Sequence, residues 1–154
     1  MQGFEHMKGS RAALGALEEL VRVGRRSVSA YRAAERRVAD HRLQAALAQL
    51  RRDHQRHVRE LSSILEEVGG AVVAWDGAGA EGPLFEAWSA GAAGPDRVLA
   101  ALKRAESELC AEYARHVERA YAEPLRAVLV RHLREEEAHQ AWLEESRWWR
   151  RAVG

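Results

Sequence analysis

The apolar residues of this chain recur at alternating spacings of three and four, the pattern of helices that bury one face. Residues 41–68 show it most clearly, in a track that is apolar apart from two histidines and continues through nearly four heptads. The members of this track are Leu43, Leu47, Leu50, His54, His57, Leu61, Ile64 and Val68. Similar tracks run through residues 11–39, 96–121 and 124–149. The pattern therefore predicts four long helices and no β-sheet.

Residues that favour helix ends lie at the boundaries of these tracks. Ser10 precedes the first helix as a candidate N-cap, and Asp40 marks a tight turn between the first and second helices. Gly69 and Gly70 favour the end of the second helix, and Pro124 fits the first turn of the fourth. Short turns therefore join the first helix to the second and the third to the fourth, so each pair forms a helical hairpin.

One long connection separates the two hairpins. Residues 69–95 are rich in glycine and alanine, and within them residues 83–89 could form one or two helical turns that cover the bundle. Two hairpins joined by a single long crossover are the arrangement of ferritin-like bundles. The sequence thus predicts an all-α, ferritin-like four-helix bundle. We expect one domain over residues 11–150, preceded by a tail of residues 1–10.

Several polar side chains occupy positions where the helical pattern predicts apolar ones. They are His54, His57, Glu106, His132, Glu136 and His139, with Glu35 near a helix end as a weaker seventh. Burying an imidazole or a carboxylate in a bundle core is costly unless a partner compensates for the lost hydration. A metal ion is one such partner, and a hydrogen-bonded polar network is the other. If the histidines are buried and neutral, burial should lower their pKa values.

The most specific motif is E-x-x-H in the fourth helix, formed by Glu136 and His139. Residues three apart on a helix face the same way, so both side chains can bind one ion. His54 and His57 form the matching pair in the second helix. The chain also resembles itself at an offset of 82 residues, which places His57 on His139. Two related hairpins that face each other would bring these histidines together at mid-bundle.

Glu106 extends this candidate site to the third helix. It lies on the apolar track between Leu102 and Leu109, where it is a metal ligand, the partner of a buried arginine, or exposed at the edge of the track. The predicted metal ligands are therefore two carboxylates and three imidazoles. These are His54, His57, Glu106, Glu136 and His139.

The remaining candidates have simpler interpretations. We expect His132 to be a core histidine that supports the site without binding the metal. Tyr31 and Tyr113, equivalent at the 82-residue offset, are either core aromatics with hydrogen-bonded hydroxyls or partners of the carboxylates. Cys110 is expected to be a small buried apolar residue. Three further histidines have no comparable context and are expected at the surface: His6, His41 and His116.

The fourth helix, with Glu136 and His139, resembles the ferritin-like superfamily, which includes rubrerythrin and bacterioferritin. The stretch AYRAAERRV (residues 30–38), the crossover segment PLFEAWS (residues 83–89) and the helix around Glu106 are similar to uncharacterised bacterial bundle proteins of that superfamily. The resemblance covers about residues 14 to 147 and rests on this pattern of residues.

Ferritin-like di-iron proteins take one Glu from each of two helices and E-x-x-H from each of the other two. The resemblance implies that Glu136 and His139 form one E-x-x-H motif and that Glu106 is one of the single glutamates. His57 matches the second histidine, but His54 stands where the second motif has its glutamate.

The helix that should supply the other single glutamate departs from the pattern further, because Gly24 is the residue equivalent to Glu106 at the 82-residue offset. Three histidines and two carboxylates suit one divalent ion better than two ferric ions. We therefore expect at most one transition-metal ion, iron or zinc first, in a degenerate site. A metal-free helical scaffold and a di-metal oxidase or ferroxidase are the alternatives.

Composition excludes several other classes of protein. The 24 lysines and arginines nearly balance 23 acidic residues, so bulk charge does not indicate nucleic-acid binding. No apolar run approaches the ~20 residues of a membrane span. Residues 1–10 have no apolar stretch like that of a signal peptide, and the single cysteine agrees with a reducing compartment. We therefore expect a cytoplasmic protein without membrane or nucleic-acid partners.

The end of the chain is rich in tryptophan and arginine. Two adjacent tryptophans, Trp148 and Trp149, cannot both face one core seam, and Trp142 lies close before them. Exposed aromatic residues beside arginine are typical of protein interfaces. The sequence therefore predicts self-association, as a dimer, through this end or through the crossover near Phe85 and Trp88.

Overall fold

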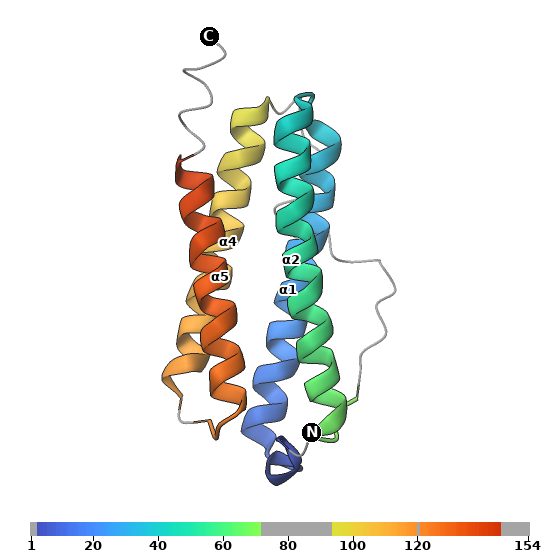
Figure 1. Ribbon diagram of the computed structural model, residues 1–154, viewed down its shortest axis with the longest axis vertical. Coiled ribbons are helices and arrows are strands. Elements are labelled where there is room, and N and C mark those ends of the chain that lie inside the picture. Colours follow the sequence, from blue (N-terminus) through green and yellow to red (C-terminus); the bar gives the residue numbers. More distant parts are fainter. Residues whose placement is uncertain (1–2, 72–93, 120, 146–154) are drawn as a thin grey trace.

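The computed structural model describes residues 3–71, 94–119 and 121–145, which form four long helices (Figure 1). These helices are α1 (Arg11–Arg37), α2 (His41–Glu67), α4 (Pro95–Glu118) and α5 (Leu125–Glu145), and a short 3-10 helix, η1 (Glu5–Met7), precedes them. No strand occurs within this part of the chain. The predicted all-α four-helix bundle is confirmed.

The caps predicted from sequence set the helix ends. The Ser10 hydroxyl accepts a hydrogen bond from the Ala13 amide at 3.3 Å, and the Asp40 carboxylate accepts one from the Leu43 amide at 2.9 Å. Gly69 follows α2 with φ +92, a left-handed conformation that glycine adopts without strain. α1 ends at Arg37, two residues before the predicted end, because the backbone is already extended at Val38. The last predicted residues of the fourth helix, 146–149, lie outside the described residues.

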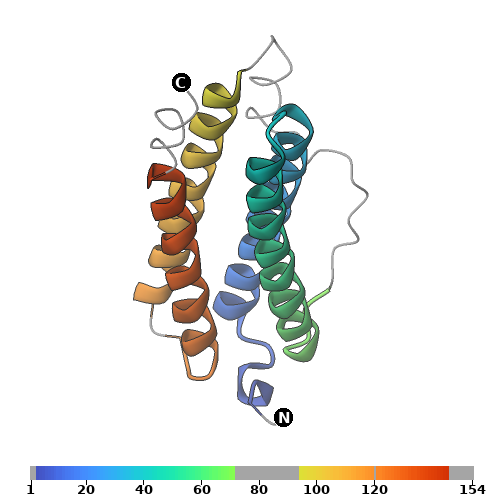
Figure 2. The ribbon, with the colours of Figure 1, turned by 45° about the horizontal axis from the view of Figure 1, so that its top comes forward.

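The helices pack as two antiparallel hairpins, α1 with α2 and α4 with α5, and α1 also packs against α4. Figures 1 and 2 both show the hairpins as separate pairs, with α2 and α4 running in the same direction. The chain therefore leaves α2 at one end of the bundle and enters α4 at the other. A helix of 27 residues is about 40 Å long, so the connection has to cover that length. The predicted cover at residues 83–89 lies outside the described residues.

The core consists of two apolar clusters, one toward each end of the bundle. The cluster near the α1 N-terminus contains Met7, Ala13, Leu17, Leu20, Val21, Leu61, Ile64, Leu65, Val68, Leu109, Tyr113, Leu125, Val128 and Leu129. The cluster near the α1 C-terminus contains Tyr31, Ala33, Ala34, Val38, Leu43, Leu47, Val98, Leu99, Leu102 and Leu143. Between them, at mid-bundle, buried polar side chains interrupt the core. None of the described helices is both long and apolar enough to cross a membrane.

Candidate metal centre

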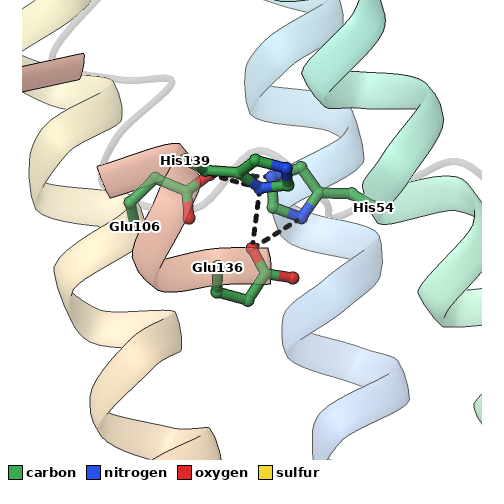
Figure 3. A group of neighbouring side chains, drawn as sticks. All are labelled: His54, Glu106, Glu136 and His139. Atoms are coloured by element: carbon green, nitrogen blue, oxygen red, sulfur yellow. Dashed lines mark hydrogen bonds and ion pairs between the residues drawn. The ribbon is translucent and has the colours of Figure 1, made fainter. Parts of the chain in front are cut away.

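Four buried side chains from three helices converge in this mid-bundle layer. They are His54 of α2, Glu106 of α4, and Glu136 and His139 of α5 (Figure 3). Each offers one nitrogen or oxygen atom, and the four atoms lie within 4.8 Å of one another. None of the four residues is more than 6% exposed. The geometry thus brings two imidazoles and two carboxylates to one point.

Short contacts hold this group, the four-residue cluster, together. His54 donates from Nε2 to Oε1 of Glu106 at 2.8 Å, and its Nδ1 lies 3.3 Å from Oε2 of Glu136. His139 Nδ1 lies 3.1 Å from the same oxygen of Glu136 and 4.0 Å from Oε1 of Glu106. Each carboxylate is therefore shared between both imidazoles, as it would be around a single cation.

Glu106 has one satisfied oxygen and one unsatisfied oxygen. The hydroxyl of Tyr31 donates to Oε1, the oxygen that also faces His54. Oε2 is buried and has no hydrogen-bond partner among the described residues. An unpaired buried carboxylate oxygen is costly, and native structures rarely leave one without an ion or water. This orphaned atom fits a site that holds a metal ion.

His57, the fifth predicted ligand, lies on the other side of Glu136. Its Nδ1 is hydrogen-bonded to Oε1 of Glu136 at 2.7 Å, and its Nε2 to Oε2 of Glu135 at 2.8 Å. His57 is buried but does not join the four atoms that converge. In this arrangement His57 fixes the orientation of the Glu136 carboxylate and leaves its other oxygen to the cluster.

Three buried histidines of the mid-bundle layer share a common arrangement, in which Nε2 is hydrogen-bonded to a partly exposed carboxylate. The pairs are His139 with Asp53 at 3.2 Å, His57 with Glu135 at 2.8 Å, and His132 with Glu60 at 2.8 Å. In each pair Nδ1 faces inward. A carboxylate behind a histidine is the usual support of a metal-ligating imidazole, because it fixes the tautomer and the ring orientation.

Sequence reasoning did not find these three supporting carboxylates. Two of them carried a signal, because Asp53 and Glu135 are equivalent at the 82-residue offset and directly precede His54 and Glu136. Glu60 has no such counterpart, since Trp142 occupies the equivalent position.

His132 is the core histidine that the sequence led us to expect beside the site. It is fully buried and its ring stacks on that of His57, with centroids 4.0 Å apart. Its Nδ1 accepts a hydrogen bond from the Tyr113 hydroxyl at 3.2 Å, while Nε2 faces Glu60. Burial and the neighbouring His57 lower the pKa of His132 to about 4. Both duplicated tyrosines thus place their hydroxyls on buried polar partners, Tyr31 on Glu106 and Tyr113 on His132.

The two histidines of the cluster have raised pKa values, in contrast to His132. Burial alone would lower the pKa of His54, but Glu136 and Glu106 outweigh it and raise that pKa to about 10. Burial opposes and the Glu136 carboxylate again prevails at His139, whose pKa is raised. Burial would raise the pKa of Glu136, yet the imidazoles, His54 foremost, hold it well below its usual value. The expectation of lowered histidine pKa values is therefore wrong for His54 and His139, because the carboxylates lie within hydrogen-bond distance.

α1 contributes no carboxylate to the layer. Gly24 is the counterpart of Glu106, and a Cβ atom built on it would lie 2.7 Å from Cγ2 of Val58. A longer side chain at this position would meet the side chain of Val58 on α2. Tyr31 is the residue through which α1 reaches the cluster.

Two other expectations from sequence have clear outcomes away from the cluster. Glu35 is partly buried in an ion pair with Arg51, away from the converging ligand atoms, so it is not part of the site. His116, expected at the surface, is only 1% exposed, and that expectation was wrong. It packs between α4 and α1, where its Nε2 lies 3.1 Å from Glu19 and its Nδ1 lies 3.2 Å from the Tyr121 hydroxyl.

The remaining histidines and the cysteine fit their expected surroundings. His6 and His41 are exposed, as expected. Cys110 is buried, and burial together with the nearby Glu106 raises the pKa of its thiol to about 12. Cys110 belongs to the apolar core and is not among the converging ligand atoms.

Comparisons with known proteins place the chain in a family. Neither a search of curated proteins nor a search of solved structures found a match. One family model matches residues 12–130, a stretch that contains nearly all of α1, the whole of α2 and α4, and the start of α5. His54 and Glu106 lie within the matched stretch, and Glu136 and His139 lie beyond it. Because this match covers most of its length, the chain belongs to the family described as Domain of unknown function (DUF2383).

Proposed function

We propose that this bundle binds one divalent transition-metal ion at mid-bundle, between His54, Glu106, Glu136 and His139. The observation that carries the proposal is the convergence of four buried ligand atoms within 4.8 Å of one another. The unpaired Oε2 of Glu106 supports it, because a cation would satisfy the one buried oxygen that the described residues leave without a partner.

The donor set indicates which ions would fit. Two imidazoles with two carboxylates suit zinc or ferrous iron better than the hard ions magnesium and calcium, which prefer oxygen ligands alone. Two carboxylates also balance the charge of one divalent ion. Binding would displace the proton that His54 holds in the metal-free protein, so the metal takes over the interaction that the imidazolium makes with Glu106 and Glu136.

A place in the ferritin-like superfamily is part of this proposal. It is supported by two hairpins whose second and third helices run parallel, and by the E-x-x-H pair in the last helix. A di-metal oxidase has less support, because the cluster has two of the four carboxylates of that pattern. His54 replaces a third, and α1 offers Tyr31 and a closely packed Gly24 in place of the fourth. The proposed site therefore holds a single ion.

A metal-free polar layer is the second candidate, in a bundle that serves as a scaffold. One observation favours it: apart from Oε2 of Glu106, the buried side-chain nitrogens and oxygens of the described residues all have partners. His54 and His139, with raised pKa values, form ion pairs with the carboxylates without any added cation.

Metal analysis separates the two candidates. Protein stripped with a chelator is titrated with Zn²⁺, Fe²⁺ under anaerobic conditions, or Co²⁺, and bound metal is measured per chain. We expect one equivalent for the wild type and a loss of binding for His139→Ala. The matched control is His132→Gln, which changes a buried histidine of the same layer outside the cluster and should retain one equivalent. If none of the three ions binds, the metal-free scaffold is the remaining candidate. Two equivalents that are both lost in His139→Ala would favour a di-metal site, whereas one that persists would lie at the separate group of Glu19, Glu112 and His116.

A further inference from the structure

We infer that the metal ion enters and leaves the bundle between α2 and α5, through a surface seam closed by Arg56. This inference rests on the metal site proposed above. The seam consists of Asp53, Arg56 and Glu60 on α2 with Arg131 and Glu135 on α5. Its three carboxylates are those that support the three buried histidines from outside.

The seam differs from the other helix contacts in its chemistry. α1 packs on α2, α4 on α5 and α1 on α4, whereas α2 and α5 are not among the closely packed pairs. Side chains bridge α2 and α5 instead: Arg56 bonds Glu135, and Arg131 bonds Glu60. Exposed ion pairs of this kind exchange with water at little cost. Parting two apolar helix faces would expose hydrophobic surface and is far less favourable.

Arg56 bridges α2 and α5 at the surface of the seam. It is half exposed and binds Asp53 on its own helix at 2.9 Å and Glu135 on the facing helix. The same two carboxylates support His139 and His57 from outside. Arg56 thus sits, as a positive group, on the two acidic residues that an incoming cation would meet first, one side chain away from the cluster.

Substitution of Arg56 should therefore change the rate of metal exchange. Arg56→Ala removes one positive charge and leaves Asp53 and Glu135 without their arginine partner. The two carboxylates then attract cations, and the bridge between α2 and α5 at this point is lost. We expect Co²⁺ uptake by chelator-stripped protein to become at least about three-fold faster at low ionic strength, with a steeper fall as salt is added. Release of Co²⁺ to excess chelator should also accelerate, so that the dissociation constant changes less than either rate. Arg56→Gln, which keeps much of the side-chain length, should behave in the same way.

Arg115 provides a matched control on the other side of the bundle. It is also half exposed and bonds two carboxylates, Glu19 of α1 and Glu112 of α4, across the contact between α1 and α4. Arg115→Ala therefore removes the same charge from the same kind of bridge. Glu19 and Glu112 form, with His116, a second group that could hold an ion, so uptake by the mid-bundle site is taken as the part that His139→Ala abolishes. We expect the rate of that part to stay unchanged in Arg115→Ala.

The experiment is stopped-flow absorption of Co²⁺ binding to the full chain, with folding of each variant checked by circular dichroism. Faster uptake in both Arg56 variants, with Arg115→Ala at the wild-type rate, supports the seam as the route. Unchanged uptake in the Arg56 variants, or equal acceleration in Arg115→Ala, would overturn it while the proposed site stands. Absence of Co²⁺, Zn²⁺ and Fe²⁺ binding by the wild type would overturn the proposed site and the route together.

Discussion

Replacing His132 with glutamine should remove a large part of the acid sensitivity of the metal-free protein. His132 is fully buried and neutral, with a pKa lowered to about 4 by burial and by its stacking partner His57. In the unfolded chain a histidine has a pKa near ~6.5. Below that value His132 takes up a proton in the unfolded chain but not in the folded protein, so the free energy of unfolding falls as the pH falls.

The magnitude follows from these two pKa values. A difference of about 2.5 units corresponds to roughly 3 kcal/mol once the pH is below both. Between pH 7.5 and pH 5 the unfolded chain becomes almost fully protonated at this site while the folded protein does not. This part of the range should therefore account for about 2 kcal/mol of the lost stability. Glutamine can still hydrogen-bond to Tyr113 and Glu60 but does not titrate.

Urea denaturation at several pH values, with a chelator present throughout, measures this effect. We expect the free energy of unfolding of the wild type to fall by about 2 kcal/mol more than that of His132→Gln between pH 7.5 and pH 5. His41→Gln, which changes an exposed histidine, serves as the control and should follow the wild type. Equal losses in the wild type and in His132→Gln would refute the assignment of His132 as a buried neutral histidine.

Three further predictions concern packing, hydrogen bonding and assembly. Gly24→Ala should lower the free energy of unfolding, measured by thermal or urea denaturation, by about 1–3 kcal/mol, because the new methyl group meets the side chain of Val58. Val58→Ala in the same chain should recover much of that loss. If Gly24→Ala leaves the stability unchanged, the close approach of α1 and α2 is contradicted. Tyr31→Phe should cost the metal-free protein about 1–3 kcal/mol, since a buried carboxylate loses its donor, and an unchanged unfolding midpoint would count against that hydrogen bond. Self-association through the tryptophan-rich end stays a prediction: sedimentation should show a dimer that Trp148→Ser/Trp149→Ser converts to a monomer, and a monomeric parent protein at micromolar concentration would rule it out.

The helices and most of the cluster were predictable because both depend on spacing. A track such as that of α2 fixes which side of the helix is buried, and it therefore also shows that His54 lies on the buried side. Glu106, Glu136 and His139 were identified in the same way, from their positions on apolar tracks. Position on a track predicts burial, but the direction of each side chain within the layer depends on how the helices pack against one another.

The parts that the sequence did not predict depend on contacts between helices. Glu60 and Glu135 lie beside the buried tracks and are about one-third exposed, so they resemble ordinary surface acids until the facing histidine is placed. The pKa of His54 rises because Glu106 lies 2.8 Å away, a distance that no spacing rule supplies. His116 is buried because α1 and α4 pack directly. The tryptophans at residues 148 and 149 lie outside the described residues.

The layer of polar residues has a consequence for how the two hairpins hold together. His54 comes from the first hairpin, and Glu106, Glu136 and His139 come from the second. A metal ion bound among them would join the two hairpins at mid-bundle, between the two apolar clusters that both hairpins share. By linkage, the free energy of metal binding is then also free energy of docking, about 2.7 kcal/mol when free metal is present at a hundred times its dissociation constant. The concentration of free metal would then determine how strongly the two hairpins are held together.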